Sequence, residues 1–118
     1  MGGKSQIVNL DYLNSMSGGN PDIIREMIEM FNQQIPGFIQ EMNDLYNRQD
    51  WIKLGALAHK AKSSIAIMGM DELTGKMKEL EMKARNSEDT DTYKHYITLF
   101  EDQTNQAVEE LKEIIKTL

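Results

Sequence analysis

Three residues close together in the chain, His59, Lys62 and Ser63, are of types that can carry out nucleophilic chemistry together. A neutral imidazole is a good nucleophile near pH 7, because its ordinary pKa is about 6.5. If it attacked a phosphoryl group, the product would carry up to about two negative charges. A lysine one helical turn away would offset that charge, and a serine hydroxyl would donate a hydrogen bond.

The apolar spacing around His59 places this histidine at the flank of a helix and not in its core stripe. Successive residues of a helix are rotated by about 100° around its axis. On this basis the line of residues that contains His59 is rotated roughly 115° from the line of apolar residues expected to face the core. The core stripe contains Leu54, Ala58, Ala61 and Ile65, and the flanking stripe contains Gly55, His59, Lys62, Ser63 and Ala66. A histidine beside a lysine is most often an ordinary exposed residue. Small neighbours favour a site, because exposed helix positions more often carry Glu, Lys or Gln.

The helix that carries His59 is one of four long helices that the periodic apolar residues predict. Asn20-Pro21 and Asp50 are typical starts of a helix, and Gly69 is typical of its end. Pro36 lies inside a periodic stretch, so we expect it to kink or split that helix. The expected helices cover residues 21–48, 50–68, 71–85 and 93–118, with a short helix at 10–16 before them.

The order of these segments predicts an all-α fold. No stretch shows the alternation of a strand, and short connections between consecutive helices favour antiparallel neighbours. We therefore expect an up-down-up-down four-helix bundle with a short N-terminal helix. It would span residues 9–118, and residues 1–8 would form a flexible leader.

Composition excludes several classes of protein. The chain has 118 residues with a net charge of −6, which argues against a nucleic-acid binder. It contains no cysteine, so it has no disulfide framework, and no apolar run approaches the length of a membrane span. The second histidine, His95, lies off the apolar stripe and reads as an exposed residue, and no histidine-carboxylate spacing predicts a metal site. We expect a cytoplasmic protein without membrane insertion.

The stretch Ala58-His59, Lys62-Ser63 and Gly69 resembles the signature of histidine-containing phosphotransfer (HPt) domains. The resemblance covers about residues 10 to 117, almost the whole chain. It includes Phe31 with Pro36, Asp50-Trp51 at the start of the histidine helix, and Leu80-Glu81 on the next helix. Many members have Gly at the position of Ser63, and Ser is small enough to keep the site open.

The resemblance implies a phosphoryl carrier in a two-component phosphorelay. His59 would accept a phosphoryl group from an aspartyl phosphate on a receiver domain and pass it to an aspartate on another receiver. Lys62 would stabilise the charge, Ser63 would be a small or hydrogen-bonding neighbour, and Glu81 could orient the imidazole. The partners would be response-regulator receiver domains and a hybrid sensor histidine kinase.

The same resemblance implies that the chain needs no cofactor of its own, because the receiver would supply Mg²⁺. No ATP-binding glycine motif is present, so we expect a phosphocarrier without complete kinase activity. The receiver would dock over the His59 face of a monomer. The residues expected at that surface are Leu13, Met16, Gly55, Ala66, Ile67 and Gly69, although Leu13, Met16 and Ile67 could equally cap the core.

Two alternatives remain open from the sequence. One is a helical interaction bundle whose histidine is idle. The other concerns context, because the chain could be free-standing or a piece of a hybrid sensor kinase. A hydrolase or metal enzyme is disfavoured, since no nucleophile elbow or cofactor loop is present. The sequence does not name the partner, the signal or the direction of phosphate flux.

Overall fold

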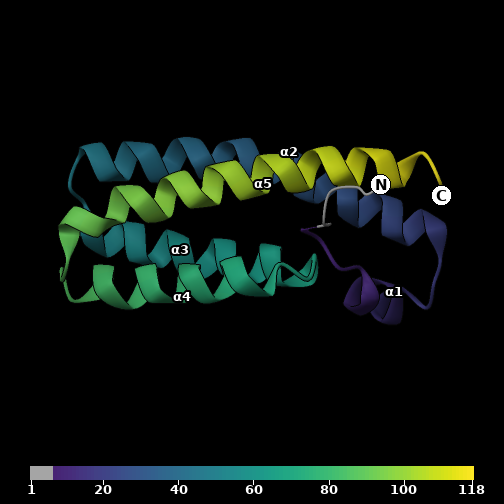
Figure 1. Ribbon diagram of the computed structural model, residues 1–118, viewed down its shortest axis with the longest axis horizontal. Coiled ribbons are helices and arrows are strands. Elements are labelled where there is room, and N and C mark those ends of the chain that lie inside the picture. Colours follow the sequence, from purple (N-terminus) through teal and green to yellow (C-terminus); the bar gives the residue numbers. More distant parts are fainter. Residues whose placement is uncertain (1–6) are drawn as a thin grey trace.

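Every regular element of the protein is a helix in the computed structural model, which describes residues 7–118 (Figure 1). No strand occurs in this part of the chain, so the prediction of an all-helical protein is confirmed. None of these helices is both long enough and apolar enough to cross a membrane. The elements are α1 (Asp11–Ser17), α2 (Pro21–Asn47), α3 (Trp51–Ile67), α4 (Asp71–Arg85), a short 3-10 turn η1 (Thr90–Thr92) and α5 (Tyr93–Ile115).

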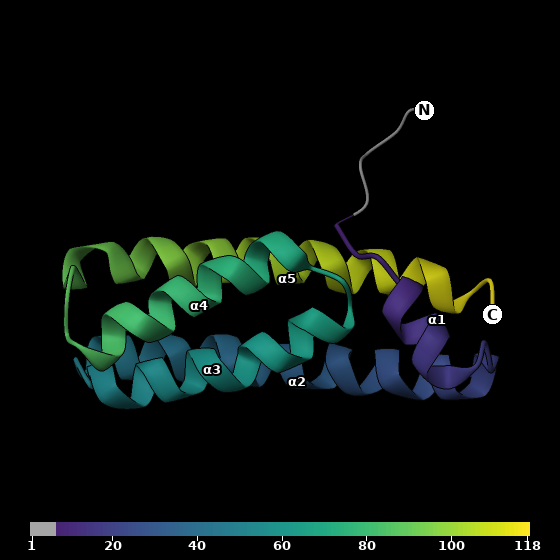
Figure 2. The same ribbon diagram turned by 90° about the horizontal axis from the view of Figure 1, so that it is seen from below.

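The four long helices run lengthwise along the molecule in two side-by-side pairs. Helices α3 and α4 form one pair and α2 and α5 form the other, and short turns join consecutive long helices (Figures 1 and 2). The short helix α1 packs near the start of α2 at one end of the bundle. This arrangement places one face of α3, which carries His59, on the outside of the molecule.

Helix α2 begins as its sequence predicts and ends within one residue of the expected boundary. The side chain of Asn20 accepts hydrogen bonds from the backbone N–H groups of Asp22 and Ile23, and Pro21 occupies the first helical position. Of the two effects expected from Pro36, a split does not occur, because α2 runs as a single helix from Pro21 to Asn47 with Pro36 inside it. Its seven buried residues recur at alternating steps of four and three, the spacing of one helical face; they are Ile24, Ile28, Phe31, Ile35, Phe38, Met42 and Leu45.

Helix α3 has a capped start and a glycine at its end. The carboxylate of Asp50 accepts a hydrogen bond of 3.2 Å from the backbone N–H of Lys53. Gly69 has φ of 70°, the left-handed conformation that favours glycine. A Cβ at this position would also lie 2.2 Å from the carbonyl oxygen of Asn9, whose N–H donates to Met68 at 2.9 Å. Gly69 therefore makes room for the N-terminal segment.

Helices α3 and α4 approach each other closely at Gly55. A Cβ on Gly55 would lie 3.3 Å from the Cβ of Ala84 and 3.3 Å from the backbone oxygen of Glu81. Both Gly55 and Ala84 are buried. The absence of side-chain bulk here brings α4, and Glu81 with it, close to the helix that carries His59.

The packed part of the chain begins earlier than residue 9, which corrects the predicted boundary. Val8 is only 4% exposed and belongs to the core. The backbone N–H groups of Ile7 and Val8 donate to the carboxylate of Glu110 on α5, at distances of 2.9 to 3.2 Å. Residues 1–6 of the expected leader lie outside the described residues.

Candidate functional site

His59 lies on the outer face of α3, and 59% of its side chain is exposed. It belongs to a helix whose opposite face is anchored in the core by Leu54, Ala58 and Ala61, each of which is 0% exposed. The backbone under the imidazole is therefore rigid while the ring itself is reachable. This is the placement that a group must have if it is to react with another macromolecule.

Glu81 of α4 provides the partner for the imidazole. Its Oε2 atom lies 3.0 Å from Nδ1 of His59, although the two residues are 22 positions apart in the chain. Only 5% of the Glu81 side chain is exposed, so this carboxylate lies between α3 and α4. A buried carboxylate is costly unless it is paired and hydrogen-bonded.

Three basic groups surround the Glu81 carboxylate. Nζ of Lys62 donates to Oε1 at 2.9 Å, and the guanidinium of Arg85 lies 2.7 Å from Oε2, the oxygen that also contacts His59. Burial raises the pKa of Glu81, but the hydrogen bond from Lys62 and the positive charges of Lys62, His59 and Arg85 together outweigh it. The pKa of Glu81 therefore lies below its ordinary value, and the group is ionised at neutral pH.

The charge of Glu81 determines the tautomer of His59. An ionised carboxylate can only accept hydrogen bonds, so the Nδ1 atom of His59 must be the donor. In the neutral ring the proton is then on Nδ1, and Nε2 keeps its lone pair. The exposed imidazole thus has one nitrogen held by the protein and one nitrogen available as a nucleophile.

Lys62 lies on the Glu81 side of His59, and 22% of its side chain is exposed. The structure brings its ammonium to Oε1 of Glu81, while His59 contacts Oε2 of the same carboxylate. Arg85, with 56% of its side chain exposed, is the more accessible of the two cations. The sequence placed Lys62 one turn from His59 and left a contact between Glu81 and His59 open, and it did not indicate that Arg85 or Lys62 would pair with Glu81.

The surface beside His59 is made of small side chains. Ser63, one turn further along α3, is exposed, and so is Ala66. Ile52 lies two turns before His59 on the same face of α3, because seven residues are close to two full turns, and it is 62% exposed. Together these residues form a shallow stripe with an exposed apolar residue at one end.

Three of the residues expected at the docking surface lie elsewhere. Leu13 is 0% exposed and is a core residue of α1, so it cannot contact a partner. Gly55 is buried against α4, and Gly69 faces Asn9 of the N-terminal segment. Of the other expected residues, Met16 is 46% exposed on α1, and Ile67 is half-buried near the end of α3.

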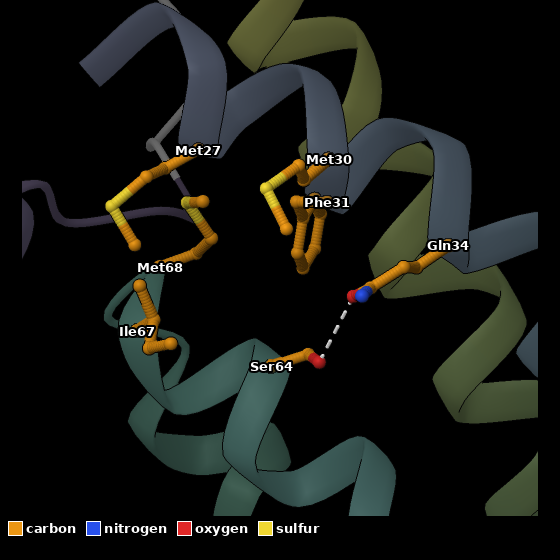
Figure 3. A pocket seen from close by; sticks show the side chains of 7 residues that line it. All are labelled: Met27, Met30, Phe31, Gln34, Ser64, Ile67 and Met68. Carbon is orange, nitrogen blue, oxygen red and sulfur yellow. Dashed lines mark hydrogen bonds between the residues drawn. The ribbon is translucent and has the colours of Figure 1, made fainter. Parts of the chain in front are cut away.

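Ile67 lies at an open apolar pocket between α2 and α3 that the sequence analysis did not anticipate. The pocket has a volume of about 140 Å³. In Figure 3, Ser64 and Ile67 of α3 face methionines of α2, and the Ser64 hydroxyl donates to Oε1 of Gln34 at 3.2 Å. The lining residues are Met27, Met30, Phe31, Gln34, Ser64, Ile67 and Met68.

The other candidate features are not brought into a site. His95 is exposed on α5, and its ring packs edge-on near Tyr96 with centroids 6.2 Å apart. Within residues 7–118, no three histidine or acidic side chains cluster in a way that could hold a metal ion. His59 and Glu81 therefore form the main chemical constellation of the described residues.

Comparison with known protein families identifies the chain. A family model described as the Hpt domain matches residues 26–117, and the chain belongs to this family. Membership implies histidine phosphotransfer in a phosphorelay, in which Hpt domains interact with receiver domains and kinases. Comparisons with curated proteins and with solved structures gave no match.

Two parts of the site had signals in the sequence that the analysis did not use. Arg85 follows Glu81 by four residues, a spacing that places both side chains on one helix face. Met27 and Met30 are three residues apart on α2 and show that the apolar face of this helix extends beyond its core stripe. Their meeting with Ile67 depends on how α2 packs on α3, which no local pattern contains.

Proposed function

We propose that this Hpt domain carries a phosphoryl group on Nε2 of His59, taken from an aspartyl phosphate of one receiver domain and passed to an aspartate of another. The observation that carries the proposal is the hydrogen bond from Nδ1 of His59 to the buried Glu81 carboxylate, at 3.0 Å. This bond leaves Nε2 unprotonated on an exposed ring.

The transfer follows from these contacts. The Nε2 lone pair attacks phosphorus, the bond between phosphorus and the aspartyl oxygen breaks, and the aspartate leaves as a carboxylate. Positive charge develops on the imidazole, and Glu81 stabilises it through Nδ1–H. Lys62 holds the other oxygen of Glu81, and Arg85 lies where its guanidinium can also offset the phosphoryl charge.

The receiver docks over the stripe formed by Ile52, His59, Ser63 and Ala66. Ile67 and the methionine-lined pocket continue this surface, since Ile67 lies eight residues, or about 12 Å, beyond His59 along α3. An interface at the small end of the usual range buries roughly several hundred Å² of surface on each partner. An interface of that size would cover both the His59 stripe and the pocket. We include Met16 of α1 in this proposed surface, because its side chain is 46% exposed.

The receiver also supplies the Mg²⁺ that phosphoryl transfer uses, so the domain acts as a carrier without an ATP site of its own. We place it in the cytoplasm as a monomer. The arrangement of α2, α3, α4 and α5 supports the up-down-up-down four-helix bundle, which we include in the proposal.

The decisive experiment incubates the protein with phosphorylated receiver domains and Mg²⁺ and assays acid-labile, base-stable phosphate. We expect label on the wild type and on His95→Gln, and none on His59→Gln. Because His59 is exposed, the melting temperature of His59→Gln should stay close to that of the wild type.

Two results would contradict the proposal. Label on His59→Gln equal to that on the wild type would place the phosphoryl group elsewhere. Absence of label from every receiver of the organism, with all proteins folded, would favour the alternative of an interaction bundle with an idle histidine.

A further inference from the structure

The charges of this acidic protein are divided unequally between its two helix pairs. Helix α3 carries Lys53, Lys60 and Lys62 and no acidic residue, while α4 carries equal numbers of acidic and basic residues. The α3–α4 pair therefore has a net charge of +3. Helix α2 has a net charge of −4 and α5 has a net charge of −3, in keeping with the net charge of −6 of the whole chain.

The positive charges of this half bracket His59. Lys53 and Lys60 are seven residues apart, so they lie two turns apart on one flank of the His59 stripe. On the other flank, Lys62 and Arg85 share the single carboxylate of Glu81, which leaves that group of three with a net positive charge.

The cations on the first flank are largely free. Lys60 is exposed, and none of the ion pairs found among residues 7–118 involves it. Lys53 has 73% of its side chain exposed and reaches Asp50 only at 3.9 Å. Exposed pairs of this kind contribute little, so both ammonium groups can serve a partner.

We propose that the receiver surface that docks on α3 is acidic beyond its phosphoryl group, and that Lys53 and Lys60 steer it onto His59. This inference rests on the proposed function, because it names the chemistry of the partner at the same site. Opposite charges across an interface raise the rate of association and orient the encounter.

The negative charges of α2 and α5 also favour approach of an acidic partner from the α3–α4 side. A negatively charged partner is repelled by the α2–α5 half and attracted by the α3–α4 half, so most productive encounters begin on the side that carries His59. A partner without a carboxylate-rich rim would gain nothing from Lys53 and Lys60, which lie outside the immediate contacts of the imidazole.

The test measures single-turnover transfer from a receiver phosphorylated with acetyl phosphate, at increasing receiver concentration and at two ionic strengths. For the wild type we expect kcat/KM to fall about ten-fold between about 20 mM and 500 mM NaCl, because salt screens exposed charges. The double variant Lys53→Glu/Lys60→Glu should lose about ten-fold at low salt and become nearly insensitive to salt.

A matched variant separates local steering from net charge. Lys112→Glu/Lys116→Glu changes the net charge by the same amount at the C-terminal end of α5, where Lys112 and the C-cap residue Lys116 pair only with exposed glutamates. Its kcat/KM should stay within about two-fold of the wild type. In both double variants the maximal rate at saturating receiver should be unchanged, because the contacts of His59 are intact.

Two outcomes distinguish this inference from the proposed function. If the wild type is labelled on His59 but the two double variants behave alike, or if transfer is insensitive to salt, the acidic partner is wrong and the carrier role stands. If no receiver labels the wild type on His59, the proposed function fails and this inference fails with it.

Discussion

The two histidines of this protein have several features in common and lie in different structural surroundings. His59 and His95 are both exposed, both are on long helices, and both have a lysine as an immediate neighbour. The imidazole of His59 is held through Nδ1 by a buried carboxylate from the adjacent helix, whereas the ring of His95 has Tyr96 as its neighbour on its own helix.

This difference shows that exposure alone does not prepare an imidazole for chemistry. The α3–α4 pair is closely packed because Gly55 and Ala84 meet without bulk, and this packing delivers Glu81 to His59. Around His95 the described residues provide no second helix that contributes an ionised partner. A fixed tautomer is therefore a property of the helix pair and not of the histidine.

Among substitutions that keep the His59 imidazole, closing the surface next to it should have the largest effect on transfer. Ser63→Phe would fill the exposed space one turn from the imidazole and obstruct the receiver, so we expect kcat/KM for transfer to fall by about a hundred-fold. Thr98→Phe, an exposed position one turn after His95, is the matched control and should leave transfer unchanged. Normal transfer in Ser63→Phe would refute the docking surface.

Removing the carboxylate of Glu81 should leave His59, like His95, without an ionised partner for its imidazole among the described residues. In Glu81→Ala the imidazole loses the acceptor that fixes its tautomer, and we expect transfer to slow by about ten- to a hundred-fold, as for other orienting partners of histidine. Glu81→Gln keeps an acceptor for Nδ1–H and should retain more activity. The ¹⁵N shifts of the ring should report mixed tautomers in Glu81→Ala, and unchanged shifts would contradict the orienting role.

Lys62→Ala should have a smaller effect. Arg85 still contacts Glu81 at 2.7 Å in this variant, so the carboxylate remains paired and the domain should stay folded. We expect transfer to slow only about several-fold, because Arg85 continues to neutralise Glu81. Circular dichroism provides the control for folding, and a rate equal to that of the wild type would exclude Lys62 from the mechanism.

The pH dependence of stability gives the smallest and most specific test. The pKa of Glu81 is lowered by Lys62, His59 and Arg85 despite its burial, so its charge stabilises the folded state above its ordinary pKa of 4.5. This stabilisation is lost as pH falls from 4.5 through the lower pKa of the folded state. Denaturant unfolding should show the difference between wild type and Glu81→Gln shrinking over that range, and a constant difference would contradict the assigned pKa direction.

Much of the helical architecture can be predicted from local signals. Apolar spacing, the caps at Asn20 and Asp50 and the left-handed Gly69 locate the helices to within a few residues. Pro36 shows the limit, because the packing of α2 on its neighbours outweighs the lost hydrogen bond and keeps the helix continuous. Leu13 shows a second limit of prediction from local sequence. It lies on a short helix and is nevertheless completely buried.

The candidate site likewise has a part that local sequence predicts and a part that depends on how the helices pack. The motif around His59 is contiguous, so the sequence predicts its candidate residues, whose roles still await the experiments above. The partner of Lys62 and the contribution of Arg85 depend on the distance between α3 and α4. Gly55 determines that distance, and its effect cannot be calculated from one helix alone.

The contact between the N-terminal segment and Glu110 has a mechanical consequence. One carboxylate accepts hydrogen bonds from the N–H groups of Ile7 and Val8, which lie more than a hundred residues from it in the chain. A force applied to the N-terminal end of the chain would first load these hydrogen bonds to Glu110 and the packing of Val8, and only then the long helices. We expect the segment to detach at low force while the helix pair that carries His59 stays intact.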